Sequence, residues 1–154
     1  MTDQENQSAQ KIHDLETQLQ LMAEDEKAYE NDPKRLNDAK DLQEIYEKFE
    51  LEKQFLADYT STNQTVRVYI QKMLTRLYAA DDPTQIDATH NSKINSLGFP
   101  IYHMETADGY RLYYAYSKTS AKPIHILCHC IKSKEAVYFN KMKNSETLKK
   151  KFRN

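Results

Sequence analysis

The spacing of apolar residues changes once along this 154-residue chain, and that change does most to constrain its fold. Up to about residue 80, apolar side chains recur every three or four residues, which predicts helices. From Ile101 onward, short runs of β-branched and aromatic residues are separated by turn signals, which predicts strands. A block of helices followed by a block of strands is typical of the α+β class.

The first predicted helix carries a narrow apolar stripe on a charged and glutamine-rich background. Its members follow a 3-4-3 spacing, typical of a coiled coil: Ile12, Leu15, Leu19 and Met22. Two heptads alone are marginal in water. We therefore expect the stripe to dock on the rest of the chain, to pair with a second copy, or to receive another protein.

Further helices are predicted by their boundary residues. Asp32 can cap a helix that begins at Pro33, and residues 63–80 place one apolar stripe before Asp81-Asp82-Pro83. Between them, residues 43–59 fit either an extended helix or a short strand followed by a helix near Leu51.

Three strands are predicted in the last third, at residues 101–105, 110–116 and 124–131, with Asp108-Gly109 as a turn. We expect an antiparallel meander with helices on one face and the other face free for chemistry. Strict alternation places Arg111 on the face not covered by the 63–80 helix. In the third strand it separates an apolar set from a second set; the apolar set is Ile124, Ile126, Cys128 and Cys130, and the second is His125, Leu127 and His129.

The near-neutral total charge hides a division. Residues 1–58 contain 16 acidic and 7 basic side chains, whereas residues 59–154 contain 7 acidic and 15 basic ones. Such asymmetry indicates either a basic surface for a polyanion with an acidic segment able to cover it, or simply well-solvated helix faces.

Composition excludes several classes of protein. With only two glycines, the chain has no glycine-rich phosphate loop, and no apolar run is long enough to span a membrane. Two cysteines only two residues apart suit a reducing compartment. We expect a cytoplasmic protein without a cofactor or a membrane partner.

A family pattern lies in the strand region. The run Gly109-Tyr110-Arg111-Leu112-Tyr113-Tyr114 follows a strand and a turn, and a later basic cluster leads into Val137-Tyr138. In order and spacing, residues of about 45–140 resemble the RelE/ParE toxins of bacterial toxin–antitoxin modules, including their HigB relatives. The resemblance implies a first strand at 45–50, a first helix at 51–60 and a second helix at 63–80. It divides the chain into an acidic amphipathic helical extension, residues 1–42, and a RelE-like domain with a basic C-terminal tail, residues 43–154.

The resemblance implies an mRNA endoribonuclease that acts on the ribosome without metal and inhibits translation. Such cleavage needs a base, cations for the phosphate and an acid for the leaving oxygen. The candidate catalytic residues are Arg111, His103, His129, Lys132 and Tyr138. Arg111 would grip the phosphate, and His103 and His129 compete for the role of base. The RNA-binding candidates are Lys134, Lys149, Lys150 and Lys151.

Each candidate also has a structural alternative. Arg111 can make cross-strand contacts only, the histidines can pack inside, Tyr138 can close the core, and the tail lysines can be a frayed end. Lys132 stands where the family usually has arginine. A metal site from the histidines and cysteines near residue 128 is not expected, because alternation points the two types to opposite sides.

Two other functions remain open: a ParE-like protein that binds a target such as gyrase without cutting RNA, and an adaptor of a mobile element that works through its N-terminal helix. The expected partners are mRNA on the ribosome, and either a cognate antitoxin or the protein's own N-terminal helix; a homodimer is a further alternative. We also expect residues 1–40 to restrain the basic domain through the apolar stripe and charge attraction.

Overall fold

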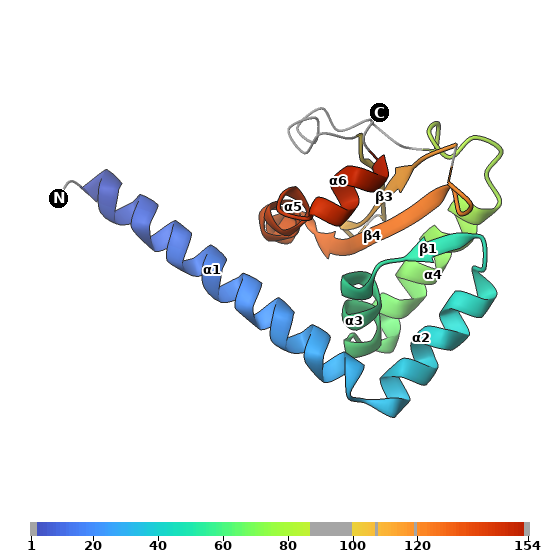
Figure 1. Ribbon diagram of the computed structural model, residues 1–154, viewed down its shortest axis with the longest axis horizontal. Helices are drawn as coiled ribbons and strands as arrows, with labels where there is room; N and C mark the ends of the chain where they lie inside the picture. The colour runs from blue at the N-terminus through green and yellow to red at the C-terminus, as the bar shows by residue number, and fades with distance from the viewer. Residues whose placement is uncertain (1–2, 87–99, 107, 119, 153–154) are drawn as a thin grey trace.

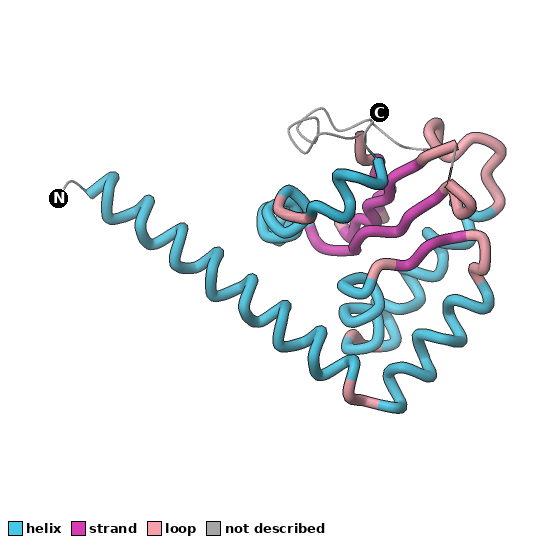
Figure 2. Tube along the Cα trace, in the orientation of Figure 1, coloured by secondary structure: helices cyan, strands magenta, loops and turns pink. Residues whose placement is uncertain are grey.

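A computed structural model of the chain describes residues 3–86, 100–106, 108–118 and 120–152, with only the backbone described at 3–5 and 151. It is an α+β protein, as expected. A four-stranded sheet lies between helices, and one long helix extends from the body (Figures 1 and 2).

The elements follow in the order α1 (Asp3–Glu30), α2 (Pro33–Ile45), β1 (Phe49–Leu51), α3 (Lys53–Ser61), α4 (Gln64–Tyr78), β2 (Tyr102–Glu105), β3 (Tyr110–Tyr116), β4 (Ile124–Ile131), the 3-10 helix η2 (Lys132–Lys134), α5 (Glu135–Lys143) and α6 (Glu146–Phe152). Of the helices of the described residues, none has the length and apolarity that crossing a lipid bilayer requires.

Two of the predicted boundaries agree with the structure. The Asp32 side chain accepts from the backbone N–H groups of Lys34 and Arg35, and so caps α2 with Pro33 in its first turn. Between β2 and β3, Gly109 adopts a φ of +83°, a conformation that glycine reaches without strain. The ambiguity at 43–59 is resolved as the end of α2, a three-residue strand and α3. The strand implied at 45–50 lies at Phe49–Leu51 instead, because α2 continues to Ile45.

The sheet has the order β1-β4-β3-β2. Strands β2, β3 and β4 form the predicted antiparallel meander, and β1 joins β4 in parallel, with Phe49 beside Ile124. The chain passes from β1 through α3 and α4 before it returns to the sheet, so these two helices belong to the connection between β1 and the meander.

One sheet face, which we call the α4 face, packs against α3 and α4. Leu112, Tyr114 and Ile126 lie there against Ile70 and other fully buried residues of α4, such as Leu74. This face carries the larger core cluster of the described residues.

The opposite face, which we call the α5 face, is covered by α5 and α6. Tyr113, Ala115 and Cys128 are buried there beneath Met142 and Leu148. The expectation that one face is free for chemistry is therefore wrong. Residues 135–152 form two short helices whose apolar side chains cover most of it.

A β-bulge in β4 overturns the predicted alternation. Tyr113 pairs with Cys128 and Tyr114 with Ile126, so Leu127 is an extra residue. Beyond it the sides exchange: Cys128 and Cys130 join the α5 face, while His129 turns to the α4 face. The predicted grouping of the cysteines with Ile124 and Ile126 is therefore wrong.

Candidate functional site

A polar cluster lies on the α5 face where β2, β3 and the start of α5 meet. His103 and Glu105 come from β2, and Arg111 and Tyr113 from β3. In the antiparallel register, His103 is paired with Tyr113 and Glu105 with Arg111. Glu135, in the first turn of α5, completes what we call the Arg111 cluster. As predicted, Arg111 does not lie beneath α4.

Arg111 is held between two carboxylates. Its Nη1 donates to Glu135 Oε2 at 3.0 Å, and its Nη2 lies 3.5 Å from Glu105 Oε2. The Tyr113 hydroxyl donates to the same Glu135 oxygen at 2.5 Å. Glu135 is 17% exposed and Glu105 46%. Because the contact to Glu105 is longer and more exposed, it is the one that an incoming anion displaces more easily.

His103 is half-buried beside this arginine. Burial, and then the positive charge of Arg111, lower the pKa of His103 below its ordinary value of 6.5, against the raising effects of Glu105 and Glu135. The imidazole is therefore neutral at pH 7. Its Nδ1 and the Nε of Arg111 are buried polar atoms without a hydrogen-bond partner among the described residues. These two atoms retain hydrogen-bonding capacity that the described residues leave unused.

His129 does not belong to this cluster. The bulge at Leu127 turns its ring onto Phe55 of α3, with ring centroids 5.7 Å apart. It is 7% exposed, neither ring nitrogen has a partner among the described residues, and burial lowers its pKa to about 4. The structure thus places this histidine in the apolar core, on the face away from Arg111.

Tyr138 lies in a second polar group, at the junction of α1, α3 and α5. Its hydroxyl donates to Asp58 Oδ2 at 2.6 Å, and Gln54 donates to the other Asp58 oxygen at 2.9 Å. Burial raises the pKa of Asp58 to about 6, against the lowering effect of these two hydrogen bonds. Lys141 contacts both Gln54 and Glu26 of α1. This junction fastens the base of α1 to the body.

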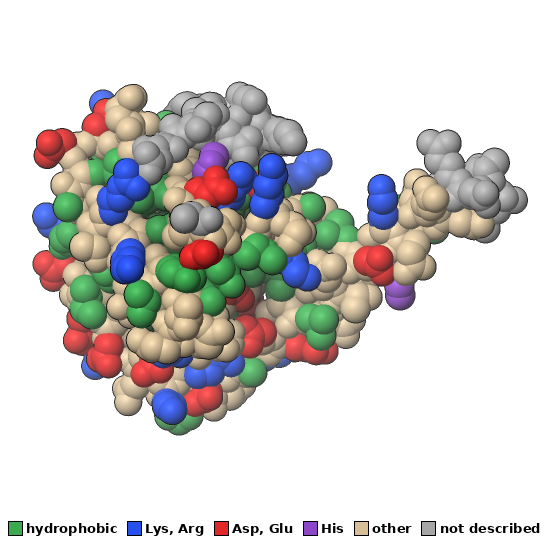
Figure 3. Space-filling view, turned by 180° about the vertical axis from the view of Figure 1, so that it is seen from behind, with side chains coloured by type: hydrophobic (Ala, Val, Ile, Leu, Met, Phe, Trp, Pro, Cys, Tyr) green, Lys and Arg blue, Asp and Glu red, His purple; other side chains and the backbone are tan. Residues whose placement is uncertain are grey.

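The predicted cationic residues are divided between two places. Lys132 is exposed in η2, two residues beyond the strand partner of Arg111, and Lys134 is exposed nearby. In α6, Lys150 is exposed, and Lys149 lies 3.5 Å from Glu146. The side chain of Lys151 lies outside the described part of the chain. Figure 3 shows acidic and basic side chains intermixed over the body, so this view presents no surface of a single sign.

The stripe predicted for partner or self-docking lies on the part of α1 that extends from the body (Figure 1). Ile12 is 58% exposed, whereas Leu15, Leu19 and Met22 are half-buried. Two ion pairs connect α1 and α2 to the body: Glu26 of α1 with Lys141, and Asp38 of α2 with Arg67. The contacts of α1 with the body lie at its base.

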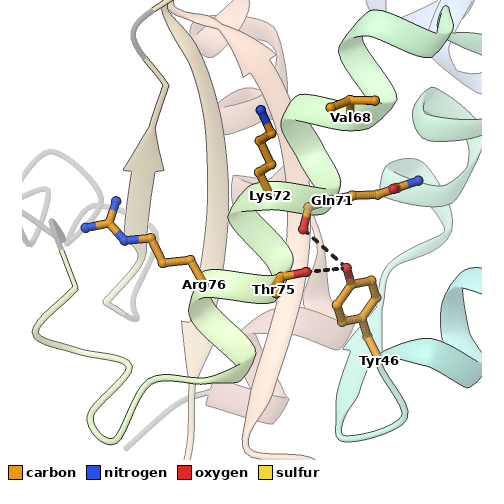
Figure 4. Close-up of a pocket in the computed structure, with 6 residues that line it drawn as sticks. All are labelled: Tyr46, Val68, Gln71, Lys72, Thr75 and Arg76. Atoms are coloured by element: carbon orange, nitrogen blue, oxygen red, sulfur yellow. Dashed lines mark hydrogen bonds between the residues drawn. The ribbon is translucent and has the colours of Figure 1, made fainter.

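A separate groove of about 440 Å³ runs along the outer side of α4. Figure 4 shows Tyr46 beside it, sharing hydrogen bonds with Thr75 Oγ1 at 2.8 Å and the Gln71 carbonyl oxygen at 3.2 Å. Arg76 extends away from Tyr46 toward the strands. The tyrosine hydroxyl thus joins the end of α2 to α4, and the groove holds none of the predicted catalytic side chains.

No group of three or more histidine, cysteine or acidic side chains that could hold a metal ion occurs among the described residues. His125 is buried with its Nε2 against Glu52. Cys128 and Cys130 are buried free thiols, and burial raises the pKa of Cys128 well above its ordinary value.

Two acidic residues of these polar clusters, Glu135 and Asp58, are not among the candidates that the sequence indicates. Glu135 lies within the basic cluster that carries the family resemblance. Its position in the first turn of a helix is the one local feature that distinguishes it. Asp58 has no such signal, because its burial depends on α1 and α5 meeting above α3.

Comparison with family models, curated proteins and solved structures finds no match for this chain.

Proposed function

We propose that this protein is a metal-independent endoribonuclease of the RelE type, which cuts mRNA on the ribosome in the bacterial cytoplasm. The observation that carries the proposal is the Arg111 cluster. It places an imidazole that is neutral at pH 7, a guanidinium and a half-exposed carboxylate on two paired strands.

The roles follow from the positions. His103 removes the proton from a ribose 2′-hydroxyl, and the 2′-oxygen then attacks the adjacent phosphorus. Arg111, released from Glu105, donates to the phosphate oxygens while Glu135 keeps its guanidinium oriented. The bond to the 5′-oxygen breaks, and that oxygen takes a proton from water or from Lys132. The products are a 2′,3′-cyclic phosphate and a free 5′-hydroxyl.

The order of elements supports the same proposal. The sequence β1-α3-α4-β2-β3-β4 is the order of strands and helices that the resemblance to RelE/ParE toxins implies. This is support from fold alone, and activity depends on the side chains of the cluster.

The test is cleavage of mRNA on programmed ribosomes by the purified full-length protein in EDTA. Arg111→Ala should lower the cleavage rate by about 10²–10³-fold, since it removes a donor that stabilises transition-state charge. Arg111→Lys keeps the charge without the two-pronged donor, so an intermediate rate is expected. Lys40→Ala, an exposed cation of α2, serves as the control and should cut at the wild-type rate.

Analysis of the product ends sharpens the result. The proposal requires a 2′,3′-cyclic phosphate or the 3′-phosphate formed from it. Cleavage that disappears in EDTA, returns with Mg²⁺ and leaves a 3′-hydroxyl would contradict it, as would an unchanged rate in a folded Arg111→Ala protein.

A second candidate function is non-nucleolytic binding, either of a gyrase-type target or as an adaptor of a mobile element. It is favoured by the two carboxylates that already neutralise Arg111 and by the distribution of His129 and Tyr138 to other sites. An antitoxin fits either function. Intact mRNA after prolonged incubation, together with saturable binding of purified DNA gyrase, would support the gyrase-binding form of this alternative.

A further inference from the structure

The N-terminal part of α1, residues 6–24, which we call the arm, extends away from the body (Figures 1 and 2). The contacts that fasten α1 involve residues closer to its end: Asp25 with Arg35, Glu26 with Lys141, and the buried Tyr29. On the arm itself Ile12 is 58% exposed, whereas the other three stripe residues are half-buried. A polar-rich helix of this length is marginal in water without a partner for its apolar stripe.

The stripe is symmetric in its spacing. Ile12, Leu15, Leu19 and Met22 are separated by three, four and three residues, so the pattern reads alike in both directions around residue 17. A second copy laid antiparallel places Ile12 opposite Met22 and Leu15 opposite Leu19. Such self-complementarity is what a two-fold contact between identical chains requires.

The position of the body at the C-terminal end of α1 limits the direction in which two arms can pair. Glu26 and Tyr29 continue the same heptad positions as the stripe, and they contact α5 and pack near Ala57 of α3. The body therefore lies on the stripe side of the helix at its C-terminal end. A parallel partner arm would bring its own body into that space. An antiparallel partner carries its body at the far end and brings only the start of its helix, up to about residue 8, beside this body.

The charges along the arm favour the same direction. Residues 6–13 contain Lys11 and no acidic residue, whereas Glu24, Asp25 and Glu26 follow one another at the base. Parallel pairing would set the two acidic triplets side by side, although Arg35 and Lys141 already offset the charges of Asp25 and Glu26. Antiparallel pairing sets each triplet opposite the end of the partner arm that carries Lys11.

We propose that two copies of this protein associate through their arms, paired antiparallel around residue 17. The interface consists of four apolar side chains from each chain and a charged rim, so we expect dissociation in about the micromolar range. This inference concerns assembly and is independent of whether the Arg111 cluster cuts RNA.

The first test is the molar mass of the full-length protein from about 1 to 200 µM, by sedimentation equilibrium. The wild type should pass from monomer to dimer. The double variant Leu15→Glu/Leu19→Glu should stay monomeric, because it buries carboxylates in the seam. The matched control Thr17→Glu/Gln20→Glu adds the same charge on the outer side of the helix and should still dimerise. A wild type that is monomeric throughout, or equal dimerisation of all three proteins, would overturn the proposal.

The second test measures direction. A spin label on Ser8→Cys reports the distance between the two arms, since Cys128 and Cys130 are buried. Antiparallel pairing separates the two labelled positions by about 27 Å along the helix axis, from 18 residues at about 1.5 Å each. A distance of about 10 Å, the spacing of two adjacent helices, would show parallel pairing and contradict the proposed direction.

Discussion

The two faces of the sheet differ in the helices that cover them and in the surroundings that they give to a histidine. The α4 face carries the larger apolar core, and His129 is packed within it against Phe55. The α5 face is covered by two short helices and keeps a polar edge, where His103 lies beside Arg111. A histidine in the core has only a structural cost, whereas one at a polar edge next to a cation has the surroundings that chemistry needs.

The largest stability difference between the faces should come from their apolar residues. Leu74→Ala empties a fully buried position beneath the sheet, and we expect a loss of about 2–5 kcal/mol. Leu148→Ala should cost less, about 1–2 kcal/mol, because the short terminal helix α6 can detach locally. Urea unfolding at pH 7.5 measures both values. Equal losses would show that the two layers open as one unit.

Acid should distinguish the α4 face through His129. Since burial lowers the pKa of His129 to about 4, the unfolded chain takes up a proton first as the pH falls below about 6.5. Stability is then lost between pH 6.5 and pH 4, by about 3 kcal/mol in total. His129→Leu should therefore stabilise the protein, and its advantage should grow across that range. A gain that does not change with pH would contradict the burial of this imidazole.

Asp58, near the α5 side, should show the opposite dependence. Burial raises the pKa of this carboxyl to about 6, so the folded chain takes up a proton before the unfolded chain does, and stability rises as the pH falls from about 6 to 4. Asp58→Asn keeps an acceptor for Tyr138 and removes the buried charge. We expect about 1–3 kcal/mol of added stability at pH 7.5 and no gain at pH 4. Thermal unfolding at the two pH values checks this.

Much of the fold follows from local patterns. Asp32 with Pro33, Asp108 with Gly109, and the short runs of β-branched and aromatic residues in β3 and β4 each determine their element through short-range chemistry. For this reason the strand limits at 110–116 and 124–131 agree with the structure.

The site was less predictable, for two physical reasons. In β4 the residues from Ile124 to Ile131 are apolar or neutral on both sides, so nothing in the pattern marks Leu127 as the bulged residue. At the C-terminus, Val137, Met142, Leu148 and Phe152 do not follow one helical period, because Asn144 interrupts the helix. Tertiary packing, and not a local pattern, places these four side chains over the α5 face.

The most direct measurement compares the two histidines in the mRNA cleavage assay. His103→Ala should lower the rate by about 10²–10⁴-fold, the usual worth of a general base, in a protein that remains folded. His129→Leu should cut at the wild-type rate per folded molecule at pH 7.5. Loss of cleavage in His129→Leu with full activity in His103→Ala would contradict the assignment of the chemistry to the α5 face.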